Sequence, residues 1–328
     1  MRLRLLDVPV DGGNLRVLLW GTGAQLAVAV HGITASAMSW QAVARQMPAG
    51  WTLAAPDLRG RGRSSGLPGP YGLDAHVADV TAVLRHLAGS RRFRPVLAGH
   101  SLGAYIALLT RDAHPGLVRR LVLVDSGLPL PVPEGIDTDA ALDAALGPAI
   151  ARLRQTFPDT EAYLAFWRAH PALAEHWTAD VEAYVRYDLT GEPGRLRSRV
   201  AEEAVRADNR DLLTGKPFAD ALDRLTGPTP LLTAPAGFFG VPPPLLPPEL
   251  IKEWQRRVPQ LRHKLVPDAN HYTMVFGKPG VAAVVAAITT APPRGGQGGS
   301  SPRASAAARW KRDTAGGDGN HRIVPDAG

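Results

Sequence analysis

Gly99-His100-Ser101-Leu102-Gly103 is the stretch that decides the fold, because it fits the G-x-S-x-G pattern of a nucleophile elbow. The apolar run before it, residues 94–98, predicts a buried strand, and residues 104–109 predict a helix after it. A serine on such a strand–turn–helix corner holds its hydroxyl exposed. Glycines must flank it, because side chains there would collide with the neighbouring strand and helix. Ser101 is therefore the candidate nucleophile, and an ordinary turn serine is the alternative.

Other apolar runs alternate with helical patterns along the chain. This alternation is typical of an α/β protein with a doubly wound, mostly parallel sheet and helices on both faces. Residues 15–20 predict an edge strand of that sheet. Further strands are expected at 26–30, 51–55, 121–124, 229–234 and 261–266, and helices at 73–87, 102–113, 249–258 and 280–290.

The alternation stops between two parts of the sheet, which divides the chain into four segments. Residues 129–226 are helical in character, without a clear strand, and predict an inserted helical lid. Residues 1–128 and 227–290 then form the two parts of the α/β core. Residues 291–328 are rich in Gly, Ser and Arg and lack apolar periodicity, so a disordered tail is expected there.

Four polar residues directly follow predicted strands, namely His31, Asp57, Ser101 and Asp125. Ligand sites of parallel sheets lie at the carboxyl ends of the strands. The same edge therefore receives His271, which lies in the loop after the last predicted strand. Because a serine hydroxyl is a weak nucleophile, it needs a base within hydrogen-bond reach. His271 is the candidate base, with a solvent-exposed loop histidine as the alternative.

The base needs an acid that fixes its tautomer. The loop after the strand that follows the insertion, residues 234–240, contains no carboxylate. The loop after the strand before the insertion contains Asp125, which is the favoured acid, and a structural turn aspartate is its alternative reading. Asp268 is the second candidate, although the chain would have to turn back to bring it to His271. The third alternative is that the acid is absent or comes from elsewhere in the chain.

Backbone N–H groups are expected to hold the oxyanion that forms when the serine attacks a carbonyl. The amide of Leu102 follows the nucleophile and opens a helix. The amide of Ile33 follows His31-Gly32, where glycine lets the backbone approach the substrate closely. These two amides are the candidate oxyanion hole.

Residues 57–64, Asp-Leu-Arg-Gly-Arg-Gly-Arg-Ser, have the glycines and arginines that suit an anion. They lack the Lys-Ser/Thr pair that ends a phosphate-binding P-loop. A rigid turn tied by Asp–Arg contacts is therefore the preferred interpretation, and a phosphate cradle is the alternative.

Composition excludes several classes of protein. The chain has 328 residues, 45% of them hydrophobic and 20% charged, as in soluble globular proteins. It has no cysteine, which excludes disulfides and thiolate metal sites. Of its net charge of +7, residues 291–328 carry +3 (six Lys/Arg against three Asp/Glu), so the core gives little reason to expect a nucleic-acid partner. Neither a signal peptide nor a membrane span is evident, so a cytoplasmic location is expected.

Together, His31-Gly32, residues 57–64, the elbow at 99–103 and the late His271 resemble the α/β-hydrolase superfamily, in its lid-bearing, serine-nucleophile branch. The resemblance covers about residues 12–290. It implies an eight-stranded, mostly parallel sheet, a Ser–His–acid triad and acyl-enzyme chemistry with no metal or organic cofactor. This sequence departs from the family at its usual acid position, around Gly240. Similar dehalogenases and epoxide hydrolases use aspartate at the elbow, and Ser101 argues against both.

The sequence thus predicts a serine hydrolase that cleaves a carboxylic ester or thioester of a small molecule. An acyltransferase, or a carbon–carbon-bond hydrolase or lyase, is possible on the same framework. A non-catalytic small-molecule-binding protein is the alternative from another class, and its only support is the missing carboxylate in the loop at 234–240.

Overall fold

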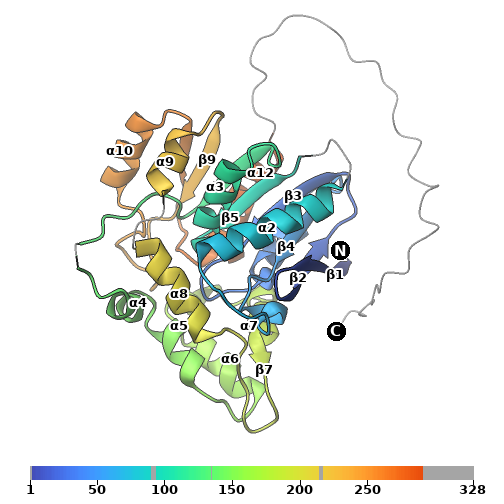
Figure 1. Cartoon of the computed structure of the whole chain (residues 1–328). Coiled ribbons are helices and arrows are strands. Elements are labelled where there is room, and N and C mark those ends of the chain that lie inside the picture. Colours follow the sequence, from blue (N-terminus) through green and yellow to red (C-terminus); the bar gives the residue numbers. More distant parts are fainter. Residues whose placement is uncertain (1, 90–93, 134, 214–216, 291–328) are drawn as a thin grey trace, which may run out of the picture.

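The structure is a computed structural model that describes residues 2–89, 94–133, 135–213 and 217–290 (Figure 1). The tail predicted for residues 291–328 lies outside the described residues.

The core is a single sheet of eight strands in the order β1-β2-β4-β3-β5-β6-β9-β10 (Figure 1). All neighbouring strands run parallel except the pairs β1/β2 and β2/β4. The prediction of a mostly parallel eight-stranded sheet is therefore confirmed. The strands are β1 (Leu3–Val10), β2 (Gly13–Trp20), β3 (Gln25–Val30), β4 (Trp51–Pro56), β5 (Val96–His100), β6 (Arg120–Val124), β9 (Thr229–Thr233) and β10 (Leu261–Leu265).

Helices cover both faces of this sheet, and the side chains of the central strands alternate between two cores. Val28 and Val30 of β3 pack with α2 and α3, whereas Ala27 and Ala29 pack with α1 and α12. A period of two with both faces buried explains why the central strands are unbroken apolar runs. The core helices are α1 (Gln41–Gln46), α2 (Leu73–Ala88), α3 (Leu102–Ala113), α10 (Pro248–Arg257), α11 (Thr273–Phe276) and α12 (Lys278–Thr289).

One strand prediction is wrong: residues 15–20 do not form the edge of the sheet. They belong to β2, which pairs with β1 on one side and with β4 on the other. The edge strand is β1, whose register runs from Leu3 opposite Trp20 to Val10 opposite Gly13. Charged residues interrupt its apolar pattern, as expected of an edge strand with solvated side chains.

The segment between β6 and β9 is mainly helical, and most of it lies below the sheet in the view of Figure 1, whereas its last helix lies beside β9. It also contains a small antiparallel pair, β7 with β8, which the sequence did not indicate. We call residues 125–228 the inserted segment. Its elements are α4 (Thr138–Leu146), α5 (Pro148–Ala151), α6 (Thr160–Arg168), α7 (Ala179–Asp188), β7 (Leu189–Thr190), β8 (Arg197–Ser198), α8 (Glu202–Leu213) and α9 (Phe218–Asp223).

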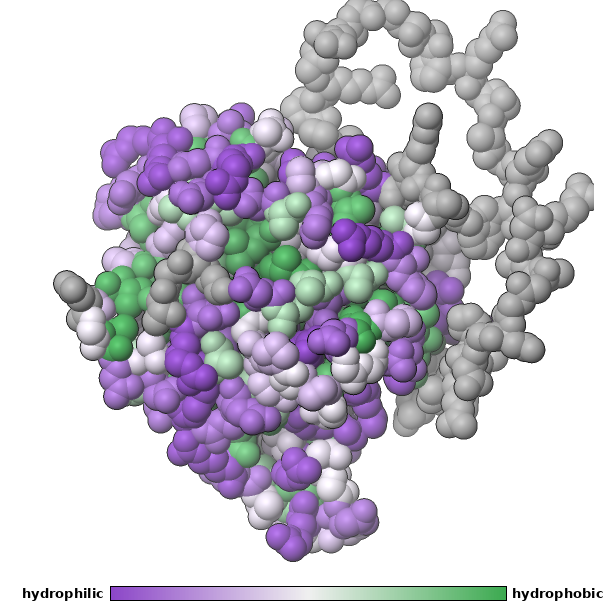
Figure 2. Space-filling view, in the orientation of Figure 1, coloured by the Kyte–Doolittle hydropathy of each residue, from purple (hydrophilic) through white to green (hydrophobic). Residues whose placement is uncertain are grey.

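The face shown in Figure 2 is hydrophilic along most of its margins, and hydrophobic residues gather in a band across the middle. Within the described residues, no helix is both long enough and apolar enough to cross a membrane.

Candidate active site

Ser101 lies on a sharp turn between β5 and α3 with φ 56° and ψ −127°. This is a rare conformation for a residue with a side chain, and such strain is typical of functional sites. A Cβ on Gly99 would lie 2.0 Å from the Gly103 carbonyl oxygen, and one on Gly103 would lie 2.1 Å from that of Val30. The two glycines therefore let strand and helix meet closely enough to hold Ser101 in this turn.

His271 and Asp125 form a buried pair at the carboxyl edge of the sheet. Nδ1 of His271 lies 2.7 Å from Oδ2 of Asp125, and the two side chains are only 4% and 1% exposed. The other carboxylate oxygen, Oδ1, accepts from the backbone N–H of Ala234 at 2.9 Å. Because a carboxylate only accepts, Nδ1 of the ring carries the proton and Nε2 has a lone pair available to act as a base.

The second candidate acid, Asp268, is exposed to solvent, with φ 56°. Of the two carboxylates considered from the sequence, the structure brings Asp125 to His271. The loop that lacks a carboxylate contributes at its start the Ala234 amide that holds Asp125 in place.

Two further side chains that the sequence analysis did not assign to the site fix the ring of His271. His100 Nε2 donates to the His271 carbonyl oxygen at 2.9 Å, and the two ring centroids are 4.6 Å apart. The ring of Phe238 packs edge-on against the His271 ring, with 4.4 Å between the two ring centroids. Burial lowers the pKa of His100 well below its usual value, so this ring is neutral. Only its place beside the nucleophile in the elbow could have pointed to this role.

The loop after β3 passes directly beside Ser101. His31 Nε2 accepts from the Leu58 amide at 3.0 Å, so its Nδ1–H donates to the Gly32 carbonyl at 2.8 Å. The Ala35 amide donates to the same carbonyl at 3.1 Å. Since N–H and C=O point in opposite directions across a trans peptide, these bonds fix the direction of the Ile33 N–H. Burial lowers the pKa of His31 to about 3, consistent with a neutral ring.

Two buried arginines hold the next carbonyls of this loop. Arg61 Nε donates to the Ile33 carbonyl at 3.0 Å, and Arg152 Nη2 donates to the Thr34 carbonyl at 2.8 Å. Arg61 also pairs with Asp208 of α8 at 2.5 Å. The loop is therefore connected through buried ionic contacts to the inserted segment.

Residues 57–64 form the tied turn that the sequence favoured. Asp57 accepts from the amides of Ala37 and Arg63, both at 2.8 Å, and from the Tyr187 hydroxyl at 2.6 Å. Arg59 forms a buried pair with Asp79 at 2.7 Å. The side chains of Asp57 and Arg59 thus bond to other side chains and to the backbone of the protein. The motif has a structural role.

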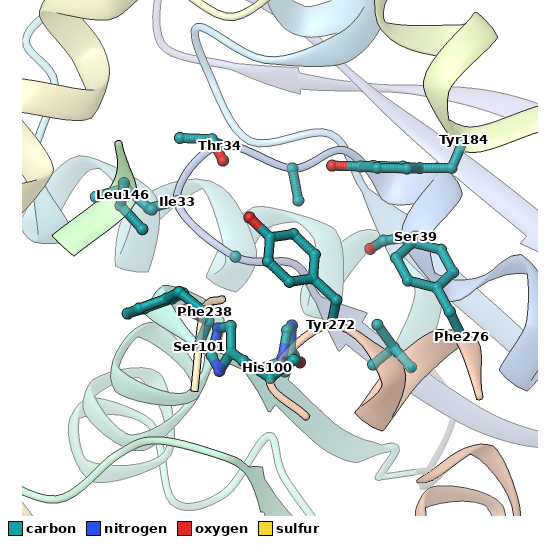
Figure 3. A pocket seen from close by; sticks show the side chains of 14 residues that line it. Ile33, Thr34, Ser39, His100, Ser101, Leu146, Tyr184, Phe238, Tyr272 and Phe276 are labelled. Atoms are coloured by element: carbon teal, nitrogen blue, oxygen red, sulfur yellow. Dashed lines mark hydrogen bonds between the residues drawn. The ribbon is translucent and has the colours of Figure 1, made fainter. Parts of the chain in front are cut away.

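A small cavity of about 30 Å³ opens beside Ser101 and His271 (Figure 3). In this view Ser101 and Phe238 lie on one side, with Tyr184 and Phe276 on the other. Its walls are largely aromatic and aliphatic. Within the part of the chain that the structure describes, no group of three or more His, Asp or Glu side chains could hold a metal ion.

The arrangement of a parallel sheet, a serine elbow and a late histidine agrees with the comparison with known families. The model of the alpha/beta hydrolase family matches residues 27–287. The chain therefore belongs to the alpha/beta hydrolase family.

Curated relatives share part of this sequence. The chain is 34% identical over 143 residues to Lipase LipV of Mycobacterium tuberculosis, which covers 42% of this chain and 53% of the relative. It is 37% identical over 121 residues to N-formylmaleamate deformylase of Pseudomonas putida, covering 36% and 44%. It is 31% identical over 157 residues to 2-(acetamidomethylene)succinate hydrolase of Mesorhizobium japonicum, covering 48% and 54%. The matches span about half the length of these relatives.

Solved structures resemble the chain over most of its length. The thioesterase domain from the curacin biosynthetic pathway superposes with a TM-score of 0.70 at 21% identity, covering 89% of this chain and all of the other. An E-2-(acetamidomethylene)succinate hydrolase superposes with a TM-score of 0.70 at 24% identity, covering 87% and 98%. At these identities the likeness shows the shared fold.

Proposed function

We propose that this protein is a serine hydrolase that cleaves a carboxylic ester or thioester of a small molecule through an acyl-enzyme. Ser101 is the nucleophile, His271 the general base and Asp125 the acid that orients it. The amides of Ile33 and Leu102 form the oxyanion hole. Hydrolysis is also the reaction named for several of the relatives.

In the first half-reaction His271 Nε2 takes the Ser101 hydroxyl proton while Oγ attacks the substrate carbonyl carbon. The negative charge that develops on the carbonyl oxygen is stabilised by the two amides. The carbon–oxygen or carbon–sulfur bond to the leaving group then breaks, and His271 gives its proton to the departing alcohol or thiol.

Water completes the cycle. His271 removes a proton from a water molecule, which attacks the acyl carbon, and the bond from that carbon to Ser101 Oγ breaks. The proton returns to Oγ through His271, and the carboxylic acid leaves. Throughout, Asp125 stabilises the imidazolium form of His271.

The observation that carries this proposal is the buried bond of 2.7 Å between His271 and Asp125, beside a serine held at φ 56° on the same small cavity. A buried carboxylate that accepts from both a histidine ring and a backbone amide is fixed in the position from which it can orient that ring. The inserted segment supplies Leu146 and Tyr184 to the cavity wall, so we propose that it acts as the lid.

The test is the release of acid from ethyl esters of short- and medium-chain acids, followed by titration at constant pH, for the wild type, Ser101→Ala and Asp125→Asn. Ser101→Ala abolishes turnover and labelling by a fluorophosphonate, and Asp125→Asn lowers kcat by about 10⁴-fold in a folded protein. The Asp268→Asn variant is the matched control and keeps its rate. A wild type that neither turns over esters nor reacts with the fluorophosphonate would disprove the proposal.

A further inference from the structure

A second, larger cavity of about 220 Å³ adjoins Ser101. The two cavities share Ile33, Ser101, Leu146 and Phe238, so they meet at the nucleophile. The larger one extends between α3 of the core and helices α4 and α8 of the inserted segment. A substrate whose carbonyl carbon lies at Ser101 can therefore place one group in each cavity.

The larger cavity is built for an uncharged chain. Its walls are mainly aliphatic, and none of the described residues that line it carries a charge. Two of its polar side chains are already bonded to backbone carbonyls: the Tyr105 hydroxyl to Leu128 at 2.8 Å, and the Asn209 amide to Thr138 at 2.6 Å. A carboxylate or ammonium placed there would lose its water without gaining an ionic partner, which is costly.

The position of His271 decides which half of the substrate enters which cavity. His271 lines the smaller cavity and is absent from the walls of the larger one. In the mechanism proposed above, this ring gives its proton to the leaving group, which must therefore depart on the His271 side. The acyl chain then lies in the larger cavity.

We infer that the substrates are esters of uncharged aliphatic acids of medium chain length with short leaving groups. This inference rests on the proposed function and adds to it the direction in which the substrate lies. Aliphatic burial in the larger cavity supplies binding energy for the acyl chain. The smaller cavity, of about 30 Å³ against about 220 Å³, leaves less room on the side of the leaving group.

The first experiment compares ethyl octanoate with octyl acetate, which are isomers with the long chain on opposite sides of the ester. Acid release is followed by titration at constant pH, so that no chromogenic leaving group is needed. We expect kcat/KM to be at least about tenfold higher for ethyl octanoate. Monoethyl suberate, which adds a terminal carboxylate to an acyl chain of the same length, is expected to react at least about a hundredfold more slowly than ethyl octanoate.

The second experiment changes the cavity wall. Ala141 is half-buried on α4 and lines the larger cavity, whereas Ala144 of the same helix is exposed and lies outside both linings. Ala141→Phe lowers the ratio of kcat/KM for ethyl octanoate over ethyl acetate by about tenfold or more. The control Ala144→Phe leaves that ratio unchanged.

Failure of this inference is distinguishable from failure of the proposed function. Ser101-dependent turnover with equal rates for the two isomers, or with octyl acetate preferred, overturns the inference alone. So does rapid cleavage of monoethyl suberate. Absence of both turnover and fluorophosphonate labelling overturns the proposed function. If Ala141→Phe does not fold, the wild-type isomer comparison still decides.

Discussion

Gly32 has little room for a side chain, because its α-carbon lies next to Ser101, the proposed nucleophile. A Cβ added there would lie 3.1 Å from Ser101 Cβ and 3.5 Å from Oγ. Contacts of that kind make a neighbour move by a few tenths of an ångström. In the proposed mechanism this neighbour is the attacking group, so we expect the consequence to be catalytic more than structural.

We therefore predict that Gly32→Ala lowers kcat/KM for ester hydrolysis by about 10- to 100-fold, since small misplacements of reacting groups have effects of this size. The melting temperature should change little. Gly116→Ala is the control, because nothing lies within 4 Å of the Cβ it would add. Equal activity of the two variants would show that Gly32 does not limit the position of Ser101.

Residues of the candidate site differ in how far the sequence revealed them. Ser101, Asp125 and His271 follow strands in one sheet, so their approach could be predicted from the topology. His100 and Phe238 could not be assigned in this way, because their contacts with the His271 ring depend on side-chain directions and loop shape. No sequence pattern predicts these side-chain directions or the shape of the loop.

At the scale of elements, α8 is joined to the core by a buried ionic cluster. Asp208 accepts from Arg61 at 2.5 Å, from the Gly72 amide at 3.0 Å and contacts His76 at 2.9 Å. Its burial raises the pKa of the Asp208 carboxyl, but Arg61 and His76 outweigh that effect and leave the pKa below its usual value. The carboxylate is therefore the stable form in the fold.

We predict that Asp208→Asn lowers the free energy of unfolding by about 3–5 kcal/mol, because it leaves Arg61 buried without its counter-charge. Denaturant unfolding at neutral pH measures this change. The control is Asp223→Asn, which breaks an exposed pair with Arg257 and should leave the unfolding midpoint unchanged. If Asp208→Asn lowers the free energy of unfolding as little as the control does, water or other groups compensate the charge of Arg61.

The elements themselves were largely predictable, and the exceptions have physical causes. Buried strands and amphipathic helices of the core carry strong apolar patterns. β1 was missed as the edge because solvated charges interrupt it, and β7 and β8 are too short to show a pattern. The Arg61–Asp208 pair joins residues 147 positions apart, a separation over which local sequence says nothing about contact.

For the molecule as a whole, the site exists only when distant parts of the sheet are assembled. Ser101 follows β5, Asp125 follows the adjacent β6, and His271 follows β10, at the far edge of the sheet. The Asp125 amide donates to Leu232 of β9 at 2.7 Å, which links the acid to the part of the sheet after the insertion. Conditions that loosen the sheet should therefore abolish activity and fold together.

Buried histidines make that assembly sensitive to acid. His31 and His100 are held neutral by burial, with the pKa of His31 lowered to about 3 and that of His100 well below its usual value. In the unfolded chain such rings take up a proton below about pH 6.5. The unfolded state then binds more protons than the folded one. The contribution of these two rings to the free energy of unfolding is therefore present above pH 6.5 and is lost as the pH falls. Buried Asp57 has the opposite effect on stability at acid pH. Desolvation raises the pKa of its carboxyl, so there the folded state binds more protons than the unfolded one.

The contribution of one ring is separated by comparing the wild type with His100→Gln, whose amide can still donate to the His271 carbonyl. We expect the free energy of unfolding of the wild type to fall more steeply between pH 6 and pH 5, by about 1.2 kcal/mol over that pH unit relative to the variant. Urea unfolding at several pH values measures both curves, and His86→Gln on the exposed face of α2 serves as the control that parallels the wild type. Parallel curves for His100→Gln and the wild type would mean that His100 takes up a proton in the folded state. The conclusion that a neutral His100 ring supports His271 would then be wrong.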